Sequence, residues 1–238
     1  MKSSRTILVL QTGDPVPSVE ARRGPFAQMI RDAIGPLWPG EYAVADVRAE
    51  PPPAKLEGVA AVVITGSSAN VPDREPWMLR TEAWLRDVVG AGVPVFGICF
   101  GHQILAQALG GEVIRNPRGR EIGTKTIARN ADDPIFAGLP GEIVANVTHV
   151  DTVGRLPPNA VALASSPLED NHAIRFTETC YGVQFHPEID ADIMRGYIET
   201  RAEILASEGI DPKALHASVT NGEMGTETLR NFIRTFVR

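Results

Sequence analysis

Short apolar segments alternate with amphipathic segments through the first half of the chain. Four apolar runs have the length of β-strands, at residues 6–10, 42–47, 59–65 and 93–98. The last two are apolar almost throughout, which is typical of parallel strands that are covered on both faces. Between the runs the apolar positions follow a helical period, first after Pro25 and again from about Pro76. This alternation predicts an α/β sheet with right-handed crossover connections.

The second half of the chain has a different pattern. Five short strand candidates are separated by Pro, Gly and Asn turns, at residues 121–128, 142–147, 160–164, 173–176 and 181–185. Because little helix lies between them, we expect an antiparallel addition to the parallel sheet. Beyond Asp190 we expect one helix to Ala206, a turn-rich stretch to Thr226 and a final helix that reaches Val237. The predicted fold is therefore three-layered and doubly wound, with helices on both faces of a mostly parallel sheet.

Length and composition limit the domain organisation. A chain of 238 residues buries about 70% of the surface that its unfolded form exposes, so a full hydrophobic core is expected. We predict a single domain over residues 1–238, with a core at about 5–190 and a helical extension at about 190–238. The formal charge is −6, and the basic residues are scattered along the chain, so no nucleic-acid surface is predicted.

The cysteine content and the length of the apolar runs indicate the cellular compartment of the protein. Cys99 and Cys180 are the two cysteines, too few for a disulfide framework, and this is typical of a reducing compartment. The apolar run at residues 7–10 is too short for a signal peptide. The longest uncharged run, residues 90–111, is interrupted by polar side chains and is not expected to span a membrane. We therefore expect a cytoplasmic protein without membrane contact.

Cys99 stands at a junction between a predicted strand and a predicted helix. The strand ends at Ile98, and a helical pattern begins at about Gly101. Gly97 and Gly101 flank the cysteine as small residues flank a nucleophile elbow, where a tight turn pushes one side chain outward. Such a turn also directs the first N–H groups of the helix toward whatever the side chain attacks. Cys99 is therefore a candidate nucleophile, and a small buried apolar side chain is the alternative.

A thiol with a pKa near 8.5 needs a base to act at neutral pH. The segment YGVQFHPE, residues 181–188, offers His186 and Glu188. At the end of an extended strand both side chains would lie on one face, because the strand period is two. The carboxylate could then fix the imidazole tautomer and leave the other ring nitrogen to accept the thiol proton. The alternative for this short motif is an exposed turn with an incidental charge.

Together the two segments resemble the class I glutamine amidotransferases, a thiol-dependent family with a Cys-His-Glu triad. Residues 97–103, GICFGHQ, resemble its nucleophile motif, and residues 182–188, GVQFHPE, resemble its His/Glu motif. The resemblance extends from about Val59 to Glu188 and is closest to the amidotransferase domain of GMP synthetase and its stand-alone relatives. It implies a flavodoxin-like fold and hydrolysis of the γ-amide of L-glutamine, which releases ammonia and glutamate.

The resemblance also implies roles for individual residues. Cys99 becomes the nucleophile that carries the γ-glutamyl thioester, His186 the general base and later acid, and Glu188 the group that orients it. The backbone N–H groups of Gly66 and Phe100 become the oxyanion hole. One such donor is typically worth about 10²–10³ in rate.

The resemblance implies that further residues contact the amino-acid end of the glutamine substrate. Gln103 resembles the residue that holds this end, and the stretch of Thr148, His149, Val150 and Asp151 resembles a loop that contacts it. Val150 stands in place of the usual glycine and is expected to reshape this pocket. Residues 67–69, Ser-Ser-Ala, differ from the Gly-Pro or Ser-Pro of relatives, so that loop is also expected to differ. His149 and Asp151 lack further His or Cys at ligand spacing, so we predict no metal site and no cofactor.

Three alternatives to a glutaminase remain at this point. The sequence contains no P-loop and no second domain that would activate an acceptor, so released ammonia would need a separate synthase or acceptor subunit. A self-sufficient γ-glutamyl peptidase or hydrolase could use the same triad on γ-glutamyl amides or peptides. A non-catalytic regulatory or binding module could keep the fold, although the intact triad argues against it. In a different elbow-based thiol hydrolase the acid would precede the histidine, whereas Glu188 follows His186.

Overall fold

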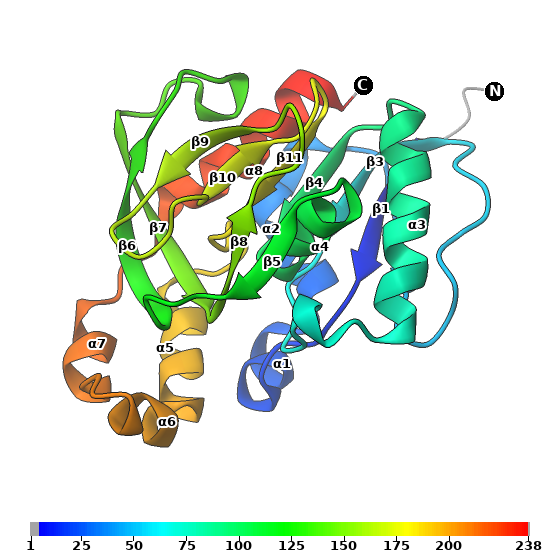
Figure 1. Cartoon of the computed structure of the whole chain (residues 1–238). Helices are drawn as coiled ribbons and strands as arrows, with labels where there is room; N and C mark the ends of the chain where they lie inside the picture. The colour runs from blue at the N-terminus through cyan, green and yellow to red at the C-terminus, as the bar shows by residue number, and fades with distance from the viewer. Residues whose placement is uncertain (1–4, 238) are drawn as a thin grey trace.

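A nine-stranded mixed sheet forms the centre of the protein (Figure 1). The computed structural model describes residues 5–237. The strand order is β2-β1-β3-β4-β11-β10-β9-β6-β7. The first five strands are parallel: β1 (Thr6–Gln11), β2 (Glu41–Asp46), β3 (Val59–Ile64), β4 (Val95–Ile98) and β11 (Cys180–Val183). The other four pair antiparallel: β6 (Glu121–Arg129), β7 (Glu142–His149), β9 (Val161–Ser165) and β10 (Ala173–Arg175). The predicted parallel core with an antiparallel addition is confirmed.

Helices cover both faces of the parallel strands. On one face, α2 (Phe26–Ile34) and α8 (Glu223–Phe236) pack on alternate residues of β1, β3 and β4. On the other face, α3 (Pro76–Gly90) and α4 (Phe100–Ala108) pack on the remaining residues of the same strands. A buried strand presents its side chains alternately to the two layers, which is why these runs are apolar throughout. The three-layer prediction is therefore confirmed.

Two features of the strand arrangement differ from the prediction. The segment expected as a last antiparallel strand is β11. It pairs antiparallel with β10, as expected, but it also pairs parallel with β4, with Val183 opposite Ile98. A second, two-stranded antiparallel sheet of β5 (Glu112–Arg115) and β8 (Asp151–Arg155) was not predicted. Both of its strands are short and carry charged side chains, so neither has the apolar pattern of a buried strand.

The segment after Asp190 also differs from the prediction. The single helix expected to Ala206 is two helices, α5 (Ala191–Thr200) and α6 (Ala202–Ser207), which are separated at Arg201. The hydroxyl of Thr200 donates to the carbonyl of Gly196 at 2.8 Å, a local bond that competes with helix continuation. The stretch expected to be turns contains α7 (Pro212–Ser218), and the Asp211 carboxylate caps it. A further short helix, α1 (Pro17–Arg23), precedes α2.

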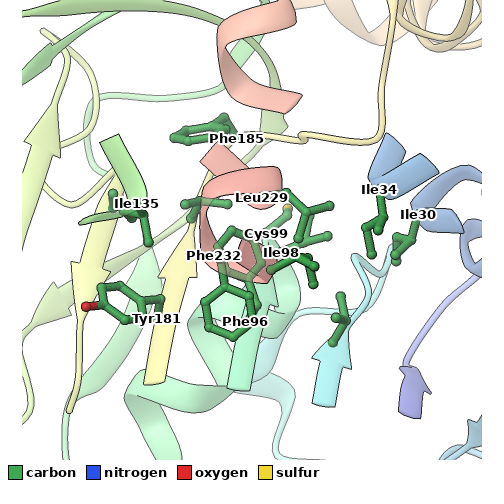
Figure 2. Close-up of a cluster of buried hydrophobic side chains, with 14 of the residues drawn as sticks. Ile30, Ile34, Phe96, Ile98, Cys99, Ile135, Tyr181, Phe185, Leu229 and Phe232 are labelled. Carbon is green, nitrogen blue, oxygen red and sulfur yellow. The ribbon is translucent and has the colours of Figure 1, made fainter. Parts of the chain in front are cut away.

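The C-terminal helix α8 belongs to the central core. Phe232 of α8 lies 5.1 Å from Phe96 of β4 and 6.1 Å from Tyr181 of β11, measured between ring centroids. Figure 2 shows Phe232 and Leu229 against these strand residues. Across residues 5–237, none of the helices combines the length and the apolar character needed to cross a bilayer.

Candidate active site

The turn between β4 and α4 is tight and places Cys99 in an unusual backbone conformation. Cys99 has φ 51° and ψ −102°, a region that non-glycine residues rarely adopt. The flanking glycines are required by close packing. A Cβ at Gly97 would lie 2.5 Å from the carbonyl oxygen of Gly101, and one at Gly101 would lie 2.5 Å from that of Ile64. The glycines therefore allow α4 to begin directly against the sheet, with the thiol at the turn.

The parallel pairing of β11 with β4 brings His186 to the same end of the sheet as Cys99. The N–H of Cys99 donates to the carbonyl of Val183 at 2.8 Å, and Nδ1 of His186 lies 2.8 Å from Oε1 of Glu188. We expected His186 and Glu188 to lie at the end of an extended strand, and this prediction is wrong. The strand ends at Val183, and His186 and Glu188 meet across a turn, because Pro187 cannot donate a ladder hydrogen bond.

Burial and charge act in opposite directions on the thiol and the imidazole. Cys99, His186 and Glu188 are all buried. Burial alone lowers the pKa of His186, but the negative charges of Glu188 and the Cys99 thiolate outweigh it and raise the pKa to about 10. Burial raises the pKa of the Cys99 thiol, but the positive charge of His186 brings the pKa below its usual value. The site therefore favours a thiolate–imidazolium pair.

The two predicted oxyanion-hole residues lie beside the thiol. Gly66 follows β3, and a Cβ at this position would lie 3.0 Å from Cε1 of His186 and 3.8 Å from Cβ of Cys99. Phe100 is the first residue of α4, where the backbone N–H has no partner within the helix. Both residues thus lie next to Cys99, and Gly66 admits no larger residue without displacing His186.

Hydrogen bonds connect the side-chain amides of two glutamines to the thiol of Cys99. Nε2 of Gln103 donates to the carbonyl of Asp151 at 3.0 Å and to Oε1 of Gln184 at 2.9 Å. Nε2 of Gln184 then donates to Sγ of Cys99 at 3.4 Å. Gln184 was not singled out from the sequence, although it lies two positions before His186 in the same motif. Because the amide hydrogens of Gln103 are used inside the protein, its carbonyl oxygen is the group available to a ligand.

Two cavities meet at Cys99. One of about 210 Å³ is bordered by Gln103, Thr148, His149 and Val150, which were predicted at the amino-acid end of the substrate. The other, of about 270 Å³, is bordered by His186 and extends toward α1, α2 and α5. The residues of the 67–69 loop border the smaller cavity. The structure thus assembles the predicted site residues around one thiol.

Arg201 is a residue of both cavities that the sequence did not suggest. Its guanidinium donates to the hydroxyl of Thr148 and stacks on the ring of Tyr197, with 4.9 Å to the ring centroid. It lies at the break between α5 and α6, which a helical pattern does not reveal. Only the packing of α5 beside α1 and β6 brings this position to the thiol.

Comparison with known proteins agrees with this geometry. The family described as glutamine amidotransferase class-I matches residues 41–199. This range holds the elbow and the His186–Glu188 turn. The chain belongs to the class I glutamine amidotransferase family.

The relatives of this amidotransferase include longer proteins. The GMP synthase [glutamine-hydrolyzing] of a Parafrankia species is 31% identical over 233 residues, which cover 92% of this chain and 40% of that protein. The GMP synthase [glutamine-hydrolyzing] of Thermomicrobium roseum is 39% identical over 128 residues, which cover 54% of this chain and 23% of that protein. The chain thus spans less than half the length of these curated relatives.

Solved structures show the same fold at lower identity. A glutamine amidotransferase from Thermotoga maritima superposes with a TM-score of 0.78 at 24% identity and covers 98% of both chains. A glutamine amido transferase from Methylobacillus flagellatus has a TM-score of 0.75 at 23% identity, with coverage of 99% of this chain and 97% of that one. At this identity the likeness establishes the class I amidotransferase fold.

A buried charged cluster supports the loop at residues 148–151 of this amidotransferase. Oε2 of Glu121 lies 3.0 Å from Nε2 of His149 and 2.9 Å from Nε2 of His172. Nδ1 of His149 faces the carbonyl oxygen of Asp151 at 3.0 Å. Because a carbonyl only accepts, Nδ1 carries a proton, and a second proton on Nε2 satisfies the contact with Glu121. Burial lowers the pKa of His149, but Glu121 and Glu169 outweigh it and raise the pKa.

The same cluster is the one group in residues 5–237 whose ligand atoms are spaced for a metal. Glu121, His149 and His172 each offer one atom, all within 4.8 Å of one another. The sequence did not reveal it, because the three residues lie on separate elements. The 3.0 Å contact between Nε2 of His149 and Glu121 is a charge-assisted hydrogen bond, and Oε1 of Glu121 accepts from the hydroxyl of Ser166 at 2.7 Å. The ion pair of Glu121 with His149 accounts for this contact and holds His149 beside the thiol.

Proposed function

We propose that this class I glutamine amidotransferase hydrolyses the γ-carboxamide of L-glutamine through a γ-glutamyl thioester on Cys99. The observation that supports the proposal is the position of Cys99 on a strained turn, buried beside the His186–Glu188 pair. Strained backbone at a buried thiol is typical of functional sites. A non-catalytic module would have no need of this conformation, or of the charge arrangement that stabilises a thiolate.

The proposed reaction has two halves. The thiolate of Cys99 attacks the γ-carbonyl carbon, and the N–H groups of Gly66 and Phe100 stabilise the negative oxygen. The carbon–nitrogen bond breaks as the imidazolium of His186 gives its proton to the departing nitrogen, which leaves as ammonia. His186 then takes a proton from water, and the hydroxide attacks the thioester. Glutamate leaves, and the proton on His186 and the thiolate are restored.

The substrate's amino-acid end is proposed to occupy the smaller cavity. There the free carbonyl oxygen of Gln103 can accept from the substrate's ammonium group, and the backbone of the 148–151 loop borders the same space. Val150 contributes its side chain where a glycine would leave more room. Its carbonyl oxygen accepts from the N–H of Asn116 at 2.9 Å, which holds the loop in place.

The ammonia is proposed to pass to a separate synthase partner. This proposal is supported by the relatives named GMP synthase, in which the matching region is less than half of the protein. Glutamine hydrolysis and the synthase reaction are then carried out by two separate chains or by two regions of one longer chain.

Glutamate release from L-glutamine tests the proposed function. We expect turnover by the purified chain, and loss of at least about 10³-fold in the Cys99→Ala variant because the nucleophile is removed. Cys180→Ala is the matched control, since Cys180 is buried on β11 away from both cavities, and burial raises the pKa of its thiol. Equal activity in the wild-type chain and in Cys99→Ala would refute the proposal.

A further inference from the structure

Given the proposed function, the two cavities that meet at the thiol of Cys99 differ in one respect, which is whether His186 borders them. His186 borders the larger cavity, whereas Gln103, His149 and Val150 border only the smaller one. In the proposed reaction, His186 protonates the departing nitrogen. The leaving group must therefore depart on the side of His186, and the larger cavity is the space that receives it. Nε2 of His186 has no hydrogen-bond partner in the described chain, so it is available to that nitrogen.

The larger cavity exceeds the needs of ammonia. Its volume is about 270 Å³. A molecule as small as water occupies about 30 Å³ in the liquid, and ammonia is of similar size. The cavity approaches the lower end of the volumes that bind whole small molecules, about 300 Å³. A substituent on the departing nitrogen would therefore fit.

The walls of the larger cavity define the chemistry of that substituent. Val16, Phe26 and Tyr197 supply apolar surface. Asp14 also borders the cavity, but both of its oxygens are held by Arg48, at 2.6 and 3.1 Å. The carboxylate of Asp14 is thus already compensated. The hydroxyls of Ser67, Ser68 and Thr148 add neutral polar groups, and besides His186 the cavity wall holds one cation.

That cation is Arg201. In the part of the chain that the structure describes, no carboxylate forms an ion pair with it, and its recorded polar contact is the neutral hydroxyl of Thr148. Burial lowers the pKa of Arg201, and the neighbouring charge of Arg120 acts in the same direction. Arg120 is different, because Glu208 pairs with it at 2.7 Å. A half-buried guanidinium without a carboxylate, within a substrate cavity, is arranged to receive an anionic group.

We propose that the larger cavity binds the leaving group of γ-glutamyl peptides, with the carboxylate of an α-amino acid on Arg201 and an apolar side chain among Val16, Phe26 and Tyr197. The amidotransferase then cleaves γ-glutamyl dipeptides as well as glutamine. The thiolate displaces the amino acid, whose nitrogen takes the proton of His186 and leaves as a free amine. Water hydrolyses the same γ-glutamyl thioester, so no further reactant is needed.

Three substrates separate the contribution of the carboxylate from that of the side chain. They are L-glutamine, γ-L-glutamyl-L-leucine and γ-L-glutamyl-isopentylamide, which is the leucine compound without its carboxylate. A charge-assisted hydrogen bond is worth about 10–100-fold, so we expect kcat/KM for γ-glutamyl-leucine to exceed that for the isopentylamide by this factor. We expect Arg201→Met to abolish the preference for γ-glutamyl-leucine over the isopentylamide. Arg201→Lys keeps the charge and is expected to retain part of the preference.

Arg195→Met is the matched control. Arg195 lies on α5, and its guanidinium donates to the carbonyl of Val219 at 3.0 Å, outside both cavities. It should leave the preference unchanged. An equal loss for all three substrates in Arg201→Met would overturn the proposal, because Arg201 would then bind the α-carboxylate that they share. A wild-type enzyme that does not distinguish the leucine compound from the isopentylamide would overturn it as well.

Binding to the Cys99→Ala variant provides a test that does not depend on turnover. Calorimetry should show tighter binding of γ-glutamyl-leucine than of the isopentylamide, by about 10–100-fold, and no difference when Arg201→Met is added. If the wild-type chain hydrolyses none of the three compounds, the proposed function fails. The binding difference still decides whether the larger cavity recognises a carboxylate.

Discussion

At the scale of single residues, the reactivity of Cys99 depends on charges placed in a water-poor environment. Glu188 contacts one nitrogen of His186 and leaves the other toward the thiol. Because all three side chains are buried, each charge acts on the others with little screening by solvent. The Cys99 thiol therefore loses its proton more readily than burial alone would allow.

This arrangement predicts a characteristic pH dependence of kcat/KM for glutamine. Because the pKa of Cys99 is lowered, activity should rise with pH below the value of about 8.5 of an ordinary thiol. It should fall again at a pH of about 10, where His186 loses its proton. In Glu188→Gln the charge that raises the pKa of His186 is gone, so the falling limb should move to lower pH and the active range should narrow.

A pH–rate profile of both proteins provides the measurement. Glu199→Gln is the matched control, because Glu199 also contacts a histidine, His216, but both side chains are exposed. Its profile should match that of the wild type. A Glu188→Gln profile with both limbs unmoved would show that Glu188 does not act on the charge of His186.

At the scale of elements, the strand–turn–helix unit of β4 and α4 was predictable from local sequence. A buried apolar run, a cysteine between glycines and a helical period are all contained within about fifteen residues. The break at Arg201 was not predictable from periodicity, since residues 191–207 continue a helical pattern on both sides of it. The pairing of β11 was also not predictable, because a short apolar strand fits a parallel or an antiparallel neighbour equally well.

The close packing of this unit makes a prediction for Gly101→Ala. The added Cβ would approach the carbonyl oxygen of Ile64 to 2.5 Å, so α4 must shift from β3. We expect a loss of about 1–3 kcal/mol in the free energy of unfolding, together with reduced glutaminase activity. Urea unfolding gives the measurement.

Gly90→Ala is the control for this substitution. Gly90 ends α3, and a Cβ there would meet nothing within 4 Å. Its stability should be unchanged or higher by at most about 1 kcal/mol, because alanine favours helix. Equal stability of the Gly101→Ala and wild-type proteins would contradict the close approach of α4 to the sheet.

At the scale of the whole molecule, the two helical layers are joined by the sheet between them. The C-terminal helix α8 packs on β4 and β11, the same two strands that carry Cys99 and lead to His186. On the opposite face, Trp77 of α3 stacks on Phe100 of α4 at 5.5 Å. Residues far apart in the chain, from α3 to α8, therefore support one site.

Phe232→Ala tests whether α8 is part of the cooperative fold. Phe232 is fully buried, so its loss should cost about 3–5 kcal/mol of unfolding free energy. Tryptophan fluorescence, which reports on Trp77 and Trp84 across the sheet and on Trp38 in the layer of α8, and far-UV circular dichroism should give one shared transition at lower denaturant. The control Ile204→Ala removes a side chain that is 46% exposed and should change stability by about 0.5 kcal/mol or less. A loss of helix that precedes the fluorescence change would show that α8 unfolds separately.

The sequence by itself determined the features that depend on neighbouring residues. These include the buried parallel strands, the turn at Cys99 and the choice of His186 and Glu188 as its partners. Tertiary structure alone decided the parallel partner of β11, the cluster of Glu121 with His149 and His172, and the two cavities that share Arg201. The physical reason is distance along the chain. Local periodicity records which face of an element is buried, whereas the neighbour that buries it is selected by the packing of the entire fold.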